Sequence, residues 1–341
     1  MADFNPLIKE WYRLNKRDLP WRLTKDPFKI WLSEIILQQT KVEQGLSYYL
    51  KFTNRFKTAE DLANTSEQEV LNLWQGLGYY SRARNLHFTA KTVVNEHKGK
   101  FPKTYTELLK LKGVGSYTAA AIASFCFDES VAVVDGNVYR VLSRVFDLEI
   151  AIDSSEGKKY FFELAQNLID KEDPALFNQA IMEFGALQCV PKNPNCEICP
   201  LDSICLSKSN GTWMNRPVKS KKTSVKHRFF HFLIFNNYQT TYLQKRNEKD
   251  IWQNLFQFPL IETDEDTEIN NFENYTLLPP SKISAEIVHI LSHQKLHARF
   301  YHFNQLPSKI DTDWIAVKIA EIQDYPIPRL IDRYLETESI D

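Results

Sequence analysis

The chain has 341 residues, of which 43% are hydrophobic and 25% are charged. This composition is typical of a globular protein, and the length allows two domains of ordinary size. The 42 basic and 43 acidic side chains nearly cancel, so any surface that binds a polyanion must be local. No apolar stretch approaches the ~20 residues of a membrane span, and the N-terminal residues lack the apolar core of a signal peptide. We therefore expect a cytoplasmic protein in a reducing compartment.

The first 205 residues are predicted to be mostly helical, because apolar residues recur there at the spacing of one helical face. Examples of the predicted helices, in chain order, are 28–40, 67–73, 81–94, 104–111, 116–125, 138–146 and 174–184.

The segment 111–122 (LKGVGSYTAAAI) predicts a tight turn between two of these helices, with Ser116 as the N-cap of the second. Gly113 and Gly115 allow the backbone to approach a ligand closely, and the N–H groups that begin the new helix can bind a phosphate. A plain connector between two helices is the alternative.

Two carboxyl groups are candidates for catalysis. Glu34 has Trp31 and Leu37 three residues away on a predicted helix and Ile30 four residues away. Burial among them would raise the pKa of Glu34, which suits an acid at neutral pH, whereas a solvent-exposed glutamate is the alternative. Asp135 follows an apolar run, and an ionised carboxylate there could stabilise an oxocarbenium-like sugar. An ordinary helix N-cap is the alternative for Asp135.

Four cysteines, Cys189, Cys196, Cys199 and Cys205, follow the pattern C-x6-C-x2-C-x5-C. Four thiolates at close spacing can hold an iron–sulfur cube, which is the interpretation we favour. Structural zinc sites usually pair two short knuckles, and only one is present, so zinc is the second possibility and disulfides are the third. Cys126 lies in an apolar run and is not expected to be a ligand.

Beyond the cysteines, the polar and basic stretch 207–226 is predicted to be a linker. An acidic loop is expected at 262–273, and a helix at 328–334. Short segments rich in aromatic or branched residues predict strands at 228–235, 240–245, 285–291, 296–303 and 314–317.

The hairpin segment and the cysteine spacing resemble those of helix–hairpin–helix base-excision glycosylases, although Lys112 stands where that family usually has proline. The segments 19–22 (LPWR), 31–40 (WLSEIILQQT) and 76–82 (GLGYYSR) narrow the resemblance to adenine DNA glycosylases of the MutY type. The resemblance is dense over residues 1–205.

This resemblance implies an all-α helix–hairpin–helix DNA glycosylase fold with an iron–sulfur loop, followed by a Nudix-like α+β domain. The implied boundaries are a catalytic domain at 1–206, with its hairpin at 105–125 and cluster loop at 189–205, a linker at 207–226 and a lesion-recognition domain at 227–341. The implied activity is removal of adenine opposite 8-oxoguanine or G in duplex DNA, by a monomer that carries one [4Fe–4S] cluster.

The resemblance also implies roles for individual residues. Glu34 is the implied catalytic acid and Asp135 the second carboxylate, with Tyr117 and Asn137 as their neighbours. The four clustered cysteines are the implied cluster ligands. The implied DNA contacts are Gln39, Tyr79, Arg82, Gly113, Gly115 and Ser116. The implied lining of the base pocket is Trp21, Arg22, Leu37, Gln179 and Glu183.

Tyr117 distinguishes this chain from related glycosylases that also nick the strand. Those enzymes have at this position a lysine that forms a Schiff base, and a tyrosine cannot do so. We therefore expect base removal without efficient strand cleavage.

The C-terminal part resembles the Nudix-like domain of the family through 252–259 and 289–293. Ser292 and His293 are the implied 8-oxoguanine contacts, and Leu291 replaces the usual phenylalanine. The glutamate-rich helix of Nudix hydrolases is missing from the sequence, so recognition is the expected role. The alternatives are a thymine or uracil mismatch glycosylase of the same superfamily, or a non-catalytic cluster protein that binds DNA or senses redox state.

Overall fold

The computed structural model describes residues 3–340 except 221–224, 268, 270, 271, 277 and 339. It divides into two compact units. The first comprises Met1–Asn64 and Phe88–Lys222, and the second comprises Thr65–His87 and Thr223–Asp341. The segment 65–87 thus groups with the C-terminal part, although the domain boundaries given above remain a prediction.

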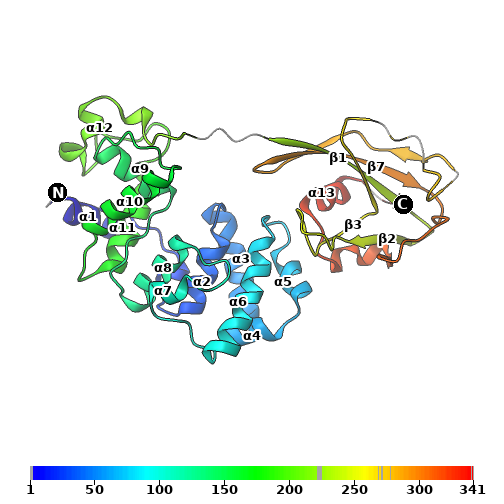
Figure 1. Cartoon of the computed structure of the whole chain (residues 1–341), viewed down its shortest axis with the longest axis horizontal. Helices are drawn as coiled ribbons and strands as arrows, with labels where there is room; N and C mark the ends of the chain where they lie inside the picture. Colours follow the sequence, from blue (N-terminus) through cyan, green and yellow to red (C-terminus); the bar gives the residue numbers. More distant parts are fainter. Residues whose placement is uncertain are drawn as a thin grey trace. The chain divides into compact units, whose positions relative to one another are not determined.

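The first unit is helical (Figure 1). Its helices and helical turns are α1 (Phe4–Asn15), η1 (Pro20–Arg22), α2 (Pro27–Ile36), α3 (Val42–Arg55), α4 (Ala59–Asn64), α7 (Tyr105–Leu108), α8 (Ser116–Phe127), α9 (Gly136–Val145), α10 (Ser155–Leu168), α11 (Pro174–Leu187), η2 (Asp202–Ile204), α12 (Leu206–Ser209) and η3 (Trp213–Asn215). Two more belong wholly or partly to the second unit, α5 (Glu67–Trp74) and α6 (Ser81–His97).

Capping residues explain where several of these helices begin. The carboxylate of Asp26 accepts from the Phe28 N–H at the start of α2, and Asp173 accepts from the Leu176 N–H at the start of α11. Several predictions at helix ends were wrong. Helix α2 ends at Ile36 rather than at residue 40, and α7 ends at Leu108 rather than at residue 111. Helix α8 is preceded by Gly115 without a side-chain cap, so Ser116 is its first residue.

Helices α1, α9, α10 and α11 share a core of apolar side chains. Its fully buried members include Ile8, Val141, Phe161 and Phe177. Helices α9 and α11 approach closely, since a Cβ atom at Gly185 would lie 2.7 Å from the Asn137 Cβ and 2.9 Å from the Asn137 carbonyl oxygen. The glycine therefore allows α11 to pack against the first turn of α9, where Asp135 and Asn137 lie.

The second unit contains two sheets. The strands are β1 (Lys226–Phe235), β2 (Thr240–Lys245), β3 (Phe256–Gln257), β4 (Leu260–Thr263), β5 (Lys282–Ile283), β6 (Ile287–Ile290), β7 (Gln294–Phe303) and β8 (Trp314–Lys318), followed by η4 (Ile319–Asp324) and α13 (Arg329–Thr337). One sheet has the order β4-β1-β7-β5 with β6 also paired to β7, and the other has the order β3-β2-β8.

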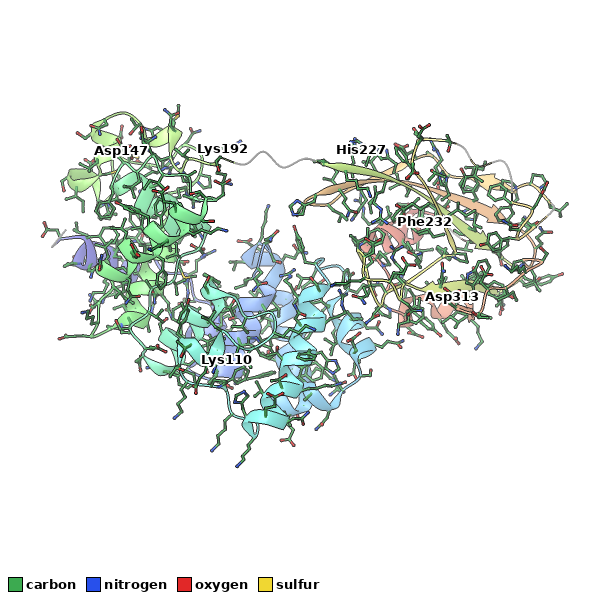
Figure 2. All side chains as sticks on the ribbon, in the orientation of Figure 1. Lys110, Asp147, Lys192, His227, Phe232 and Asp313 are labelled. Atoms are coloured by element: carbon green, nitrogen blue, oxygen red, sulfur yellow. The ribbon has the colours of Figure 1, made fainter. Side chains whose placement is uncertain are left out.

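The long parallel pair β1 and β7 forms the centre of the larger sheet. Phe232 and Phe300 pair in register across it with their rings stacked, and Phe232 lies in the interior of this unit (Figure 2). Tyr334 of α13 stacks on the Phe300 ring and so packs this helix against the sheet.

The predicted change from helices to an α+β part is confirmed. Parts of the predicted linker and acidic loop, at 221–224, 268, 270 and 271, lie outside the described residues. Within the part of the chain that the structure describes, no helix is long and apolar enough to cross a membrane.

Candidate active site

A cavity of about 290 Å³ in the first unit brings the four predicted catalytic residues together. Glu34 comes from α2, Tyr117 from the first turn of α8, Asp135 from the residue before α9, and Asn137 from the first turn of α9. Side chains separated by about a hundred residues in sequence therefore face one space.

Glu34 is 7% exposed and hydrogen-bonds the Tyr117 hydroxyl. Burial, with a smaller contribution from the Asp135 carboxylate, raises the pKa of Glu34 to about 7 against the opposing effects of that hydrogen bond and of Arg22. A carboxyl group with this pKa is substantially protonated at neutral pH and can act as an acid. The apolar flanks of the α2 helix correctly predicted this burial.

Asp135 is the N-cap of α9 and also faces the cavity. It accepts hydrogen bonds at 2.8 Å from the Asn137 N–H, the Val138 N–H and the Asn137 amide. Burial raises the pKa of Asp135, while these N–H groups favour its ionised form. The capping interpretation is thus confirmed, and it does not compete with a catalytic role, because the three donors hold the carboxyl group at a fixed position facing the cavity.

The predicted base-pocket residues all line the same cavity: Trp21, Arg22, Leu37, Gln179 and Glu183. The Glu183 carboxylate accepts from the Arg22 guanidinium at 2.6 and 2.9 Å, and from the Arg17 guanidinium at 2.7 and 2.9 Å. Burial alone would raise the pKa of Glu183, but the hydrogen bonds from Arg22 and Arg17 outweigh it and hold the value at about 2.

Sequence reasoning missed Arg17. A buried carboxylate such as Glu183 needs compensating charge, but the sequence does not show which of the basic residues near 13–22 supplies it.

The turn between α7 and α8 has the geometry expected of a backbone that contacts a ligand. Gly113 has φ 78°, and Gly113, Gly115 and Ser116 are all exposed. Because α8 begins without a side-chain cap, its first N–H groups are available to an anion.

Gln39 and Tyr79 lie at exposed positions with left-handed backbone, at φ 55° and 49°. Tyr79 is 45% exposed whereas Tyr80 is 4% exposed, which confirms the prediction that one of the pair faces inward. Arg82 is 8% exposed, and its guanidinium lies over the rings of Trp74 and Tyr79. This environment suits a residue that supports the loop, and direct contact between Arg82 and DNA stays a prediction.

The four cysteines of the spaced cluster line one pocket beside Arg144, and all five cysteines of the chain are free. The buried Arg144 guanidinium donates to the Cys189 sulfur at 3.4 Å and to the Val190 carbonyl at 2.8 Å. Among the described residues, no group of three or more His, Cys, Asp or Glu is arranged to hold one metal ion.

A continuous set of hydrogen bonds joins the cysteine loop to the cavity through Arg140, which sequence reasoning also missed. The Arg140 guanidinium donates to the Cys189 carbonyl at 2.7 Å, to the Gly185 carbonyl at 2.7 Å and to the Asn137 amide oxygen at 2.8 Å. The Asn137 amide in turn donates to Asp135. The loop that carries Cys189 therefore takes part in fixing Asp135.

In the second unit, Ser292 and His293 are exposed in the turn between β6 and β7. The Ser292 hydroxyl hydrogen-bonds the Tyr79 hydroxyl, and both residues line a cavity of about 240 Å³ that Leu291 and Trp252 also line. The two predicted lesion contacts thus lie beside one of the predicted duplex contacts.

Comparison with known proteins agrees with this geometry. Residues 32–169 match the model of the HhH-GPD superfamily base excision DNA repair protein, and residues 230–337 match that of the NUDIX domain. A solved thermostable thymine-DNA glycosylase shares 32% identity, with a TM-score of 0.58 over 61% of this chain and 96% of that one. The fold and the cavity therefore define a helix–hairpin–helix DNA glycosylase with a Nudix-like α+β domain.

Two relatives define the family more narrowly. The adenine DNA glycosylase of Buchnera aphidicola subsp. Schizaphis graminum is 35% identical over 301 residues, which cover 88% of this chain and 84% of the relative. The human adenine DNA glycosylase is 44% identical over 211 residues, which cover 59% of this chain and 39% of the relative. The chain belongs to the adenine DNA glycosylase family.

Proposed function

We propose that this enzyme hydrolyses the N-glycosidic bond of adenine opposite 8-oxoguanine, or opposite G, in duplex DNA. The observation that carries the proposal is the buried Glu34, with its pKa raised to about 7, in one cavity with Asp135. A protein that only binds DNA needs no such pair. The family supports adenine as the base removed.

The chemistry requires the adenine to leave the base stack and enter the cavity. Glu34 donates its proton to N7 of the base. The bond between C1′ and the base breaks, its electron pair goes to the base, and an oxocarbenium-like sugar remains. The Asp135 carboxylate stabilises this cation. Water adds at C1′ and loses a proton to the Glu34 carboxylate, so that adenine and an abasic site are the products.

We propose that Tyr117 makes the enzyme monofunctional. Its hydroxyl hydrogen-bonds Glu34, and a phenol cannot form an imine with the sugar. Strand cleavage should therefore require heat or base after the reaction.

We propose that Cys189, Cys196, Cys199 and Cys205 hold one [4Fe–4S] cluster. The support is their common pocket, their free thiols and the Arg144 guanidinium, which suits the net negative charge of a cluster with four thiolate ligands. When bound, such a cluster supplies a rigid cross-link between segments of the loop. The hydrogen bonds of Arg140 would then connect the rigid loop to Asn137, which in turn donates to Asp135.

We propose that Ser292 and His293 recognise the base opposite the adenine, since both are exposed polar groups beside Tyr79. Gln39 and Tyr79 would enter the duplex where the adenine leaves it. Because one chain supplies the whole cavity, we further propose that the enzyme acts as a monomer, on DNA in the cytoplasm.

The test is incubation of the purified enzyme with three duplexes that carry A opposite 8-oxoguanine, A opposite G, and T opposite G. Alkaline strand scission reports abasic sites. We expect fast product from the first, slower product from the second and none from the third. Release of thymine but not adenine would support the alternative that the structural likeness to a thymine-DNA glycosylase suggests.

A further inference from the structure

Tyr12 lies on α1, outside the cavity lining, and is 3% exposed. Its hydroxyl donates to the Gln179 Oε1 atom of α11 at 2.7 Å, across 167 residues of sequence. Its ring also lies under the Arg22 guanidinium, 5.6 Å from the guanidinium carbon. The buried Tyr12 side chain therefore contacts two residues of the base pocket, Gln179 through its hydroxyl and Arg22 through its ring.

The hydroxyl of Tyr12 is a reliable donor at neutral pH. Burial raises the pKa of Tyr12, and the nearby Arg22 lowers it less than burial raises it. The hydroxyl thus stays protonated. If the amide turned over, the hydroxyl oxygen could still accept from the amide nitrogen, but the buried phenolic hydrogen would lose the acceptor that Oε1 provides, and this loss favours the observed orientation.

We propose that Tyr12 is a positioning residue that fixes the orientation of the Gln179 amide, and through it the preference for adenine. This inference rests on the proposed function. Gln179 lines the cavity, and with Oε1 anchored by Tyr12 it presents Nε2–H as a donor beside the second lone pair of Oε1. An adenine edge carries an amino donor beside a ring-nitrogen acceptor, the pattern that a fixed amide matches with two hydrogen bonds.

Hypoxanthine is the informative competitor, because at its Watson–Crick edge an oxygen acceptor replaces the amino group of adenine and a ring N–H donor replaces the ring-nitrogen acceptor. A fixed amide then faces oxygen with oxygen, whereas an amide that can turn over recovers a match. A glutamine that is free to turn over therefore does not discriminate between adenine and hypoxanthine. A glutamine whose orientation Tyr12 fixes does discriminate between them.

Two other polar groups of the pocket have different roles, so we assign recognition of the adenine edge to Gln179. The Glu183 carboxylate already accepts from both Arg17 and Arg22, so its oxygens are occupied within the protein. Glu34 serves as the proton donor in the proposed mechanism. Gln179 thus lines the cavity with an amide whose Oε1 atom accepts a hydrogen bond from Tyr12, a residue outside the cavity lining.

The experiment compares Tyr12→Phe, Gln179→Leu and the double variant with wild type. Tyr12→Phe keeps the ring under Arg22 and removes the hydroxyl alone. Tyr139→Phe is the matched control, because it removes a hydroxyl from a half-buried ring of α9 that packs on Phe161 in the same core. Single-turnover rates are measured with adenine and with hypoxanthine opposite 8-oxoguanine, together with duplex affinity and melting temperature.

We expect Tyr12→Phe to lower the adenine rate about 3- to 10-fold, the effect of one lost hydrogen bond, and to lower the hypoxanthine rate less. Duplex affinity and the pH profile should stay unchanged. In the Gln179→Leu background the Tyr12→Phe change should cost less than twofold, because the amide that it orients is gone.

Equal loss on both bases, or multiplicative losses in the double variant, would overturn the proposal. Either result would mean that Tyr12 supports the fold without orienting Gln179. A wild-type enzyme that fails to release adenine would overturn the proposed function itself, so the two failures are distinguishable.

Discussion

The cavity of the first unit and the turn at 291–293 in the second unit present their polar groups in opposite ways. In the cavity, Glu34 is buried and Asp135 is half-buried, and protein donors hydrogen-bond both carboxyl groups. In the turn, Ser292 and His293 are exposed. The difference indicates that catalysis depends on a carboxyl group whose pKa is raised by burial. Recognition depends instead on polar groups that are exposed and can contact DNA.

The largest expected effect comes from Glu34→Gln. The amide keeps the size of the side chain but has no acidic proton to donate, so the single-turnover rate should fall by about 10²–10⁴-fold. Duplex affinity should change little, since phosphate contacts dominate it. Glu60→Gln, at an exposed position of α4, is the control. If Glu34→Gln kept more than a tenth of the wild-type rate, the acid would have to be another group.

Asp135→Asn should have the next largest effect, a loss of about 10²–10³-fold in the same rate. The amide can still cap α9 but carries no charge to stabilise the cationic sugar. The melting temperature checks the cap. A variant that melts as wild type does and still cleaves at the wild-type rate would show that charge at this position is not needed.

Arg140→Leu tests the connection between the cysteine loop and the cavity. It removes hydrogen bonds to Cys189, Gly185 and Asn137, and we expect the adenine rate to fall about 10-fold or more, as for lost bonds to a charged group. Arg13→Leu, on the exposed side of α1, is the control.

Iron analysis separates this effect from loss of the cluster. Wild type and Arg140→Leu should both carry four irons per chain, as expected for a Cys₄-bound cube, whereas Cys199→Ser should carry fewer. Stoichiometric zinc in anaerobic preparations would contradict the cluster. If Arg140→Leu lost iron in proportion to its loss of activity, Arg140 would only support the cysteine loop and would not position Asp135.

The smallest effect is expected from His293→Ala. Because His293 is exposed and does not line the cavity that contains Glu34 and Asp135, cleavage of A opposite G should be nearly unchanged. The preference for 8-oxoguanine over G should fall by a few-fold, the lower end of the ~1–3 kcal/mol that one base contact contributes. An unchanged ratio would show that His293 does not contribute to the discrimination.

Sequence reasoning named side chains that the cavity brings together, mainly because long segments of the chain resemble those of a known family. The apolar flanks of Glu34 also predicted its burial. It failed where a role depends on contacts between distant segments. Arg17, Arg140 and Tyr12 each have a hydrogen-bond partner more than 40 residues away in sequence, and no local pattern distinguishes them from other basic or aromatic residues.

Helix ends were also poorly predicted, for a physical reason. The apolar pattern continues past Ile36, but the backbone leaves the helix there, and Gln39 adopts a left-handed conformation at an exposed position. Periodicity detects the buried face of a segment, and it does not detect a turn whose residues are set by tertiary packing.

The pH dependence of the single-turnover rate tests the central claim most directly. Burial raises the folded-state pKa of Glu34 to about 7, so the protonated acid predominates below that pH and disappears above it. The account predicts a rate on A opposite 8-oxoguanine that falls as pH rises through about 7, and a profile in Glu34→Gln that lacks this step. A wild-type rate that stays level from pH 6 to about 9, or a step that persists in Glu34→Gln, would contradict it.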